Sequence, residues 1–363
     1  MYSHTHLLAF AQQIFIRLGC SPTDAELAAN VLIYADLRGV DSHGLARLAG
    51  YVRLYEAGRL NPKPNVHIVH ETPSTATVDG DKGLGLVVAP AAMKIAIDKA
   101  RNVGSGWVSI RNSNHFGIAG FHAMLALEHD MIGMTMTNAA PLVTPTFSRQ
   151  KLLGTNPIAV AVPALHQPPF VADFASTAVA YGKLEILQRK GGEAPAGWVQ
   201  DRDGNPATDS NAIKNGGALL PLGSDREHGS HKGYGLGAIV DIFSGVLSGA
   251  NYGPWVPPFA TAGFMTGASD PVGLGTGHFV GAMRIDGFRP AEEFKTHMDN
   301  WIHTFRNAPA IDGKQVLIPG DPERESEAER RQHGIPLVPS VVADLEALGE
   351  KMGVDFSSLV VSH

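Results

Sequence analysis

The stretch Asn112-Ser113-Asn114-His115-Phe116-Gly117 follows a β-like run and places a histidine among small hydrogen-bonding groups. A second polar cluster, Asp41-Ser42-His43-Gly44, lies upstream and is followed by Arg47 and Tyr51. Histidine exchanges protons near neutral pH, and the guanidinium of arginine can bind a carboxylate through two parallel hydrogen bonds. A lone histidine beside Asn and Gly is more often part of a turn or a buried imidazole. Together, however, the two clusters favour redox or proton chemistry on a small organic acid.

The composition narrows the class of protein. The chain has 363 residues and a net charge of −6, with no basic stripe, so we expect no nucleic acid partner. Its single cysteine, Cys20, excludes an intrachain disulfide and any cysteine-based metal site. The 16 histidines include no H-E-x-x-H motif, and we expect no metal. Because no signal peptide and no apolar stretch of ~18 uncharged residues is present, we expect a cytoplasmic protein without membrane contact.

Residues 1–60 predict three helices. Ser3 can cap the first, Ser21-Pro22 can open the second, and Asp41 or Ser42 can cap the third, which would end near residue 58. On this third helix Arg47 and Tyr51 would be spaced i, i+4, with His43 one turn before. We therefore expect one helix face to present an imidazole, a guanidinium and a phenol.

From about residue 66 the pattern becomes a mixture of strands and helices. β-like runs are predicted at 75–79, 106–110, 132–137, 157–162, 170–173 and 277–286. Helices are predicted at 87–101, 118–128, 177–189, 232–247, 291–306 and 341–352. Residues 191–215 are rich in Gly, Pro, Asp and Asn and predict a surface excursion, and the polar run 321–332 is expected to be exposed. The chain thus predicts an α/β core with helices at both ends.

The sequence offers no standard dinucleotide fingerprint. The one strand-to-helix candidate, Gly83-Leu84-Gly85-Leu86-Val87-Val88, lacks the third glycine of G-x-G-x-x-G. Walker A and G-x-S-x-G motifs are also absent. Two other segments suit phosphate: Asp173–Ser176 leads into a predicted helix, and Gly229–Gly233 opens another with Lys232 in its first turn. On the motif alone, a solvated Lys232 is the simpler interpretation.

Seven blocks, taken in order, resemble the malate/L-lactate dehydrogenase type 2 family. This non-Rossmann group includes ureidoglycolate dehydrogenase, sulfolactate dehydrogenase, diketogulonate reductase and piperideine-2-carboxylate reductase. The blocks are Asp41–Gly44 with Arg47, Asn112–Gly117, Gly154–Ala159, Asp173–Ser176 with Gly182-Lys183, Gly197-Trp198 with Asp201 and Asp203-Gly204, His231–Gly237, and Pro319-Gly320 with Glu323.

The resemblance implies a non-Rossmann nicotinamide-binding α/β fold with a mixed sheet. It also implies two domains. Residues 1–70 and 287–363, with part of 130–155, would form a helical domain for substrate binding and dimerisation. Residues 71–286 would form an α/β cofactor domain. A homodimer and a cofactor, NAD or NADP, are expected from it. Asp321-Pro322 stands where many relatives have Glu after Gly, which leaves the choice of cofactor open.

Site roles follow from the same resemblance, position by position. The acid/base residues would be His115 and His43, and Arg47 would hold the substrate carboxylate. Other substrate contacts would come from Tyr51, Ser42, Ser113 and Asn156. Cofactor contacts would come from Asn138, Ala139, Asp173, Phe174, Ala175, Ser176, His231, Lys232, His278, Pro319, Gly320 and Asp321.

These residues predict an oxidoreductase that transfers a hydride between NAD(P) and a small 2-hydroxy or 2-oxo acid. Reduction of a cyclic imino acid or a ring-opened sugar acid is the alternative, because the same clusters would serve C=N and C=O bonds. Two other classes stay open: a non-catalytic ligand-binding protein on the same scaffold, and a metal-dependent lyase or hydrolase.

Overall fold

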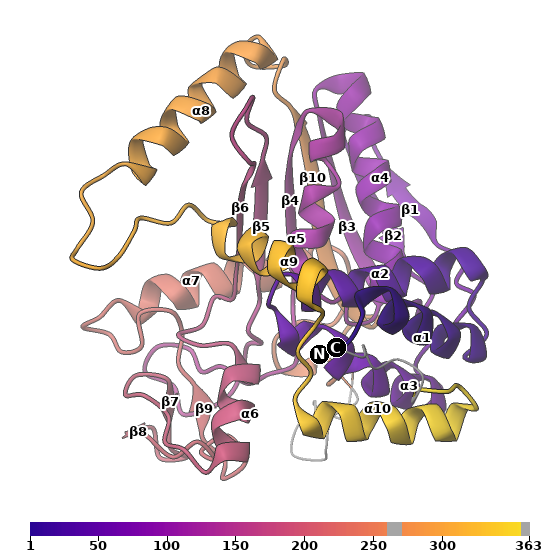
Figure 1. The fold of residues 1–363 in the computed structure, drawn as a ribbon, viewed down its shortest axis with the longest axis vertical. Coiled ribbons are helices and arrows are strands. Elements are labelled where there is room, and N and C mark those ends of the chain that lie inside the picture. The colour runs from indigo at the N-terminus through magenta and orange to yellow at the C-terminus, as the bar shows by residue number, and fades with distance from the viewer. Residues whose placement is uncertain (260–270, 357–363) are drawn as a thin grey trace.

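The computed structural model describes residues 1–259 and 271–356, and its centre is a seven-stranded mixed sheet (Figure 1). The strand order is β1-β2-β3-β10-β4-β5-β6, in which β2 and β3 are parallel and the other neighbours antiparallel. The strands are β1 (His67–Glu71), β2 (Thr75–Asp79), β3 (Ser105–Ser113), β4 (Met131–Thr137), β5 (Ile158–Val162), β6 (Phe170–Phe174) and β10 (Thr276–Arg284). The six predicted strands are therefore all present, and β1 is an addition.

Helices cover both faces of this sheet. On one face α4 (Gly85–Val103) packs against β3 and β10 through an apolar cluster that includes Val108 and Val280, and α5 (Ala119–Met124) packs beside it. On the other face α7 (Ser230–Asp241), with its π-helical continuation η4 (Ile242–Val246), packs on Phe279. Successive β10 side chains alternate between these two cores, as a strand buried on both faces requires.

A helical layer built from both chain ends lies against one end of the sheet (Figure 1). It contains α1 (His4–Arg17), α2 (Pro22–Leu37), α3 (Leu48–Glu56) and α10 (Pro339–Met352), with α9 (Asp321–His333) packed on α2. Ser21 caps α2 as predicted, because its Oγ accepts the Asp24 N–H at 3.1 Å, whereas Ser3 makes no capping bond to α1. The helix α8 (Ala291–Arg306) lies away from this layer.

A smaller lobe follows β6. It contains α6 (Tyr181–Lys190) and a three-stranded sheet of β7 (Val199–Gln200), β8 (Pro206–Ala207) and β9 (Ala218–Leu219), around a core of its own. Short 3₁₀ turns lie at η3 (Leu127–His129) and η5 (Gly253–Trp255). The predicted surface excursion thus carries small strands, and the charged run 321–332 forms α9, with only part of its surface exposed.

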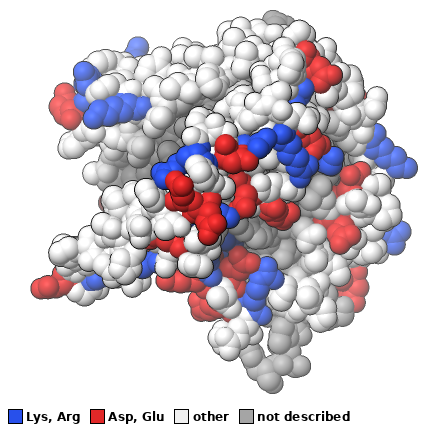
Figure 2. All heavy atoms as spheres, turned by 90° about the horizontal axis from the view of Figure 1, so that it is seen from above, with Lys and Arg blue, Asp and Glu red and all other residues white. Residues whose placement is uncertain are grey.

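In the described residues, no helix is both long and apolar enough to cross a membrane. On the face shown in Figure 2, acidic and basic side chains are interspersed rather than gathered into one basic patch.

Candidate active site

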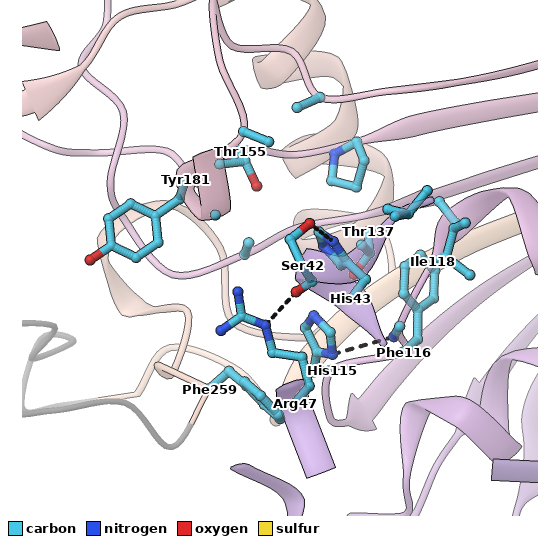
Figure 3. A pocket seen from close by; sticks show the side chains of 18 of the residues that line it. Ser42, His43, Arg47, His115, Phe116, Ile118, Thr137, Thr155, Tyr181 and Phe259 are labelled. Atoms are coloured by element: carbon cyan, nitrogen blue, oxygen red, sulfur yellow. Dashed lines mark hydrogen bonds between the residues drawn. The ribbon is translucent and has the colours of Figure 1, made fainter. Parts of the chain in front are cut away.

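A cavity of about 520 Å³ lies where the helical layer, the sheet and the small lobe meet (Figure 3). Its walls come from separate parts of the chain, and they bring His43 and His115 together. The lining includes residues from 38–47, 114–120, 137–142, 155–157, 171–175, 180–186 and 257–259, together with Arg59, Thr276 and Glu323. A volume in this range suits a small organic ligand or cofactor, for which pockets of about 300–1,000 Å³ are usual.

The two histidines are stacked neighbours. Their ring centroids are 5.7 Å apart, with 19° between the ring planes. His115 Nδ1 shares a 2.7 Å hydrogen bond with the Tyr51 hydroxyl, and the Gly117 N–H also points at this nitrogen at 3.3 Å. His43 Nδ1 shares a 2.9 Å bond with Ser42 Oγ (Figure 3). Each Nδ1 has a protein partner, and among the described residues no hydrogen bond to either Nε2 is found, which leaves Nε2 for another ligand.

The surroundings keep both imidazoles neutral. Burial, followed by the positive charge of Arg47, lowers the pKa of His43 to about 4. Burial, then His43 and Arg47, lowers the pKa of His115 well below its usual value. A neutral imidazole at physiological pH can accept a proton, which an imidazolium cannot.

Arg47 is held at two points. Its Nε donates to the Ser42 carbonyl oxygen at 2.6 Å (Figure 3). Its Nη2 lies 3.3 Å from Glu185 Oε2 on α6. The Arg47 side chain is one-fifth exposed and lines the cavity. Two anchors on a planar group fix its plane, so the remaining N–H groups are oriented for an anion.

The predicted third helix is wrong in its first turn. Residues Asp41–His43 and Leu45–Arg47 form two separate 3₁₀ turns, and α3 begins only at Leu48. Gly44 separates the turns with an extended ψ of −143°. Arg47 and Tyr51 are therefore not on one helix face: Arg47 lines the cavity, whereas Tyr51 is fully buried and reaches the site through His115.

Ser113 and His278 lie beneath the site. His278 is fully buried and bonds Ser113 Oγ at 2.8 Å and Thr137 Oγ1 at 2.7 Å, and its ring stacks on Phe116. Burial lowers the pKa of His278 to about 3. This neutral chain of hydrogen bonds joins the ends of β3, β4 and β10, and only Thr137 and Phe116 of the group line the cavity.

Two asparagines brace the cavity wall. Asn156 Oδ1 accepts the Ala139 N–H at 3.1 Å, and its Nδ2 donates to the Gly237 carbonyl at 2.9 Å. Asn138 Nδ2 donates to Asp241 and to the Asn251 carbonyl. Asn138 and Ala139 line the cavity, whereas the fully buried Asn156 supports them from behind.

Acidic groups also line the cavity. Asp173 Oδ2 accepts the Gly120 N–H at 2.6 Å, while the side chain stays open to solvent in the cavity. Phe174 and Ala175 line the cavity beside it. Carboxylates of this kind accept hydrogen bonds from sugar hydroxyls.

The profile of one protein family, described as malate/L-lactate dehydrogenase, matches residues 2–346. The chain belongs to this family. This chain is an oxidoreductase that acts on the CH–OH group of hydroxy acids, and its family implies a nicotinamide cofactor.

Three relatives illustrate the similarity. A malate dehydrogenase of Pyrococcus horikoshii is 41% identical over 351 residues, which cover 96% of this chain and 94% of that protein. The structure of the sulfolactate dehydrogenase of Methanocaldococcus jannaschii has a TM-score of 0.89 at 34% identity, covering 99% of both chains. A Δ1-pyrroline-2-carboxylate/Δ1-piperideine-2-carboxylate reductase of Pseudomonas putida is 34% identical over 248 residues, or 68% of this chain and 71% of that protein.

Several family positions lie outside the cavity as the described residues define it. Asp321 is bonded to Arg306 and Arg324, and His231 is exposed on α7 and bonded to Arg226. The family positions that lie outside the cavity lining are Tyr51, Ser113, Asn156, Ser176, His231, Lys232, His278, Pro319, Gly320 and Asp321. The cavity thus gathers one part of the family's positions: His43, His115, Arg47, Ser42, Asn138, Ala139, Asp173, Phe174 and Ala175.

The structure also adds site residues that the sequence did not single out. Glu185 anchors Arg47, and Tyr181, from the same helix, lines the cavity opposite the histidines (Figure 3). Phe259 packs its ring 4.4 Å from that of His115. The Gly182-Lys183 block lies beside Tyr181 and could have drawn attention to it. No local pattern marks Phe259.

Proposed function

We propose that this chain interconverts a 2-hydroxy acid and a 2-oxo acid, with NAD or NADP as the redox partner. The observation that carries the proposal is the pair of neutral, stacked histidines beside an anchored guanidinium in one cavity. A hydroxy acid needs these two things: a base for its hydroxyl proton and a cation for its carboxylate.

Arg47 binds the substrate carboxylate in this proposal. Its anchors on the Ser42 carbonyl and Glu185 orient the fork, and a planar fork binds a carboxylate through paired hydrogen bonds. Binding at this point brings the carbon next to the carboxylate, C2, close to the two imidazoles.

The histidines move the proton. When His115 Nδ1–H donates to Tyr51 Oη, the Nε2 lone pair is free to accept the hydroxyl proton, and Tyr51 can donate onward to the His115 carbonyl at 3.4 Å. His43 Nδ1 can donate to Ser42 Oγ in the same way. In the reductive direction the protonated ring returns the proton to the oxygen on C2. Both histidines stay candidates for this role.

The cavity residues fit a nicotinamide cofactor. Asn138, Ala139, Asp173, Phe174 and Ala175 would hold it, with carboxylate oxygen available for a sugar hydroxyl and an apolar surface for a ring. When bound, the cofactor supplies the acceptor or donor of the hydride.

A second candidate is reduction of a cyclic imino acid. It is favoured by the similarity to the Pseudomonas putida reductase. An imino acid also carries a carboxylate for Arg47, so the choice between the two functions depends on the atom bonded to C2.

We also propose a homodimer. Along α7, η4 and the residue after η4, the apolar side chains Ile239, Ile242, Val246 and Leu247 are 44–59% exposed. Such a row of exposed aliphatic side chains suits contact with a second copy. A cytoplasmic location is proposed because the reaction depends on the cell's nicotinamide pool.

The division of labour between chain segments is likewise a proposal. Residues 71–286 would hold the cofactor, and residues 1–70 with 287–363 and part of 130–155 would form the helical unit for substrate binding and dimerisation. Residues 357–363 of that unit lie outside the described residues. The exposed row on α7 and η4 offers the α/β unit as a further dimer contact.

The test is a fluorescence titration of the purified protein with NADH and with NADPH, followed by turnover with a panel of 2-oxo acids and cyclic imino acids. Saturable binding with turnover of a 2-oxo acid supports the main proposal. Preferential turnover of an imino acid supports the second candidate. Failure to bind either cofactor contradicts both. Size-exclusion chromatography with light scattering tests the dimer, and cell fractionation tests the location.

A further inference from the structure

Asp36, at the end of α2, carries a buried carboxyl group that the proposed chemistry does not use. The residue is 1% exposed, and its Oδ2 accepts the backbone N–H of Leu45 at 2.8 Å. Burial has the largest effect and raises the pKa of Asp36 to about 8, although the hydrogen bond from Leu45 acts in the opposite direction. A buried carboxyl group that bonds a backbone amide nine residues away is costly unless the fold depends on it.

The same carboxyl group explains Gly44. The φ of Gly44 is −89°, so this glycine does not lie in the left-handed region. A Cβ built there would lie 2.0 Å from Asp36 Oδ1 and 2.2 Å from Cγ. Asp36 therefore occupies the space that a side chain at position 44 would need.

This contact lies between the two functional parts of the loop. His43 ends the first 3₁₀ turn, Gly44 touches the carboxyl group, and Leu45 opens the second turn, which ends at Arg47. The Leu45 N–H is the first amide of that second turn, and the first amides of a helical turn have no partner within it. Asp36 supplies the missing acceptor from another helix.

The opposite side of the loop is also closely packed. A Cβ on Gly182 of α6 would lie 2.5 Å from Ser42 Cβ. The segment from Ser42 to Arg47 is thus enclosed between α2 and α6, and Asp36 provides its hydrogen-bonded attachment to α2. Because this attachment lies between His43 and Arg47 in the chain, its loss would change the placement of one relative to the other.

We propose that Asp36 is a positioning residue: by accepting the Leu45 N–H and excluding a side chain at position 44, it sets the placement of His43 relative to Arg47. It touches neither substrate nor cofactor. The consequence for activity rests on the function proposed above, whereas the consequence for the loop does not.

The experiment compares Asp36→Asn with Asp36→Leu. The three side chains are similar in size, but only Asn keeps an oxygen that can accept the Leu45 N–H. Asp36→Asn is expected to stay within about threefold of the wild type in kcat/KM, because a neutral acceptor replaces a weakly ionised one. Asp36→Leu is expected to lower kcat and raise KM together, with a combined loss of about 10²-fold, which is the scale for misplacing reacting groups by about 1 Å.

Asp299→Leu is the matched control. Asp299 also accepts backbone amides, those of residues 165–167, but it lies outside the cavity lining. It should lower thermal stability and leave kcat and KM unchanged. Should Asp36→Leu not fold, Asp36→Ala removes the acceptor without added bulk.

Hydrogen–deuterium exchange of peptides covering residues 41–47 tests the effect on the loop separately from the effect on activity. Faster exchange there in Asp36→Leu, with Asn restoring protection, supports positioning even if no panel substrate is turned over, in which case the proposed function alone fails. Unchanged exchange and wild-type kcat and KM in Asp36→Leu would overturn the proposal. A loss in Asp36→Leu that matches that in Asp299→Leu would do the same.

Discussion

The Tyr51→Phe substitution is the sharpest test of how His115 accepts a proton. It removes one oxygen atom, which lies 2.7 Å from His115 Nδ1, and leaves the buried ring of residue 51 in place. Without that oxygen, the partner left for Nδ1 is the Gly117 N–H, which can only donate. The neutral ring would then carry its proton on Nε2 and could not act as a base there.

The size of the effect follows from the charge that develops on His115. In the proton-accepting step its Nδ1–H becomes a charged donor, and a hydrogen bond to a charged group contributes about 1.5–3 kcal/mol. At 1.36 kcal/mol per tenfold, kcat for oxidation should fall roughly tenfold to 150-fold. Burial, His43 and Arg47 already disfavour the protonated ring, so the loss of this bond adds to their effect.

The assay is steady-state oxidation of the preferred 2-hydroxy acid, followed by the absorbance of the reduced cofactor. KM should change little, because the carboxylate is bound by Arg47 and not by Tyr51. His115→Ala, which removes the whole group, should cost more, about 10²–10⁴-fold. The reasoning is refuted if Tyr51→Phe keeps kcat within twofold while His115→Ala is severely impaired. Thermal unfolding of both variants controls for folding.

Three further predictions concern other parts of the site. Arg47→Lys should raise KM about tenfold or more with a smaller change in kcat, since an ammonium loses the planar fork; an unchanged KM would make Arg47 structural. Gly44→Ala should abolish most activity and destabilise the fold by forcing Asp36 aside, which urea unfolding and kcat/KM can check. Burial lowers the pKa of His122 to about 4, so between pH 6.5 and 4 the unfolded chain binds more protons than the folded one. His122 should therefore lower the free energy of unfolding by about 3 kcal/mol on acidification through this range. In urea titrations, His122→Asn should show a smaller fall in stability over the same pH range.

The sheet could be predicted from the sequence because each buried strand is a short apolar run between turn residues. Such runs placed β2 and β4–β6 within a residue or so at each end. The edge strand β1 was not predicted, because all five of its residues are exposed and no apolar run marks it. The charged helix α9 was not predicted for a similar reason. None of its residues is fully buried, so no apolar stripe indicates a helix.

The site could be predicted less completely than the sheet. The residue types of His43, His115 and Arg47 were predictable from their motifs, but their arrangement was not. The third helix was expected to be capped by Asp41 or Ser42, because the local signals there are those of a helix N-terminus. A carboxyl group from Asp36 and an ion pair with Glu185 decide otherwise, and both contacts join segments that no local pattern relates.

The position of Arg47 has a consequence beyond holding the carboxylate. Burial is the main cause of the lowered pKa of both histidines, and the charge of Arg47 lowers each further in the free enzyme. A bound carboxylate would neutralise that charge, raise both pKa values and make proton acceptance easier just when a substrate is present. In oxidation, which needs a neutral imidazole, the acid limb of kcat should therefore lie at higher pH than that of kcat/KM, because the two profiles report the complex and the free enzyme. Arg47→Gln should remove most of the difference, and coincident limbs in the wild type would show that the guanidinium and the imidazoles are not coupled.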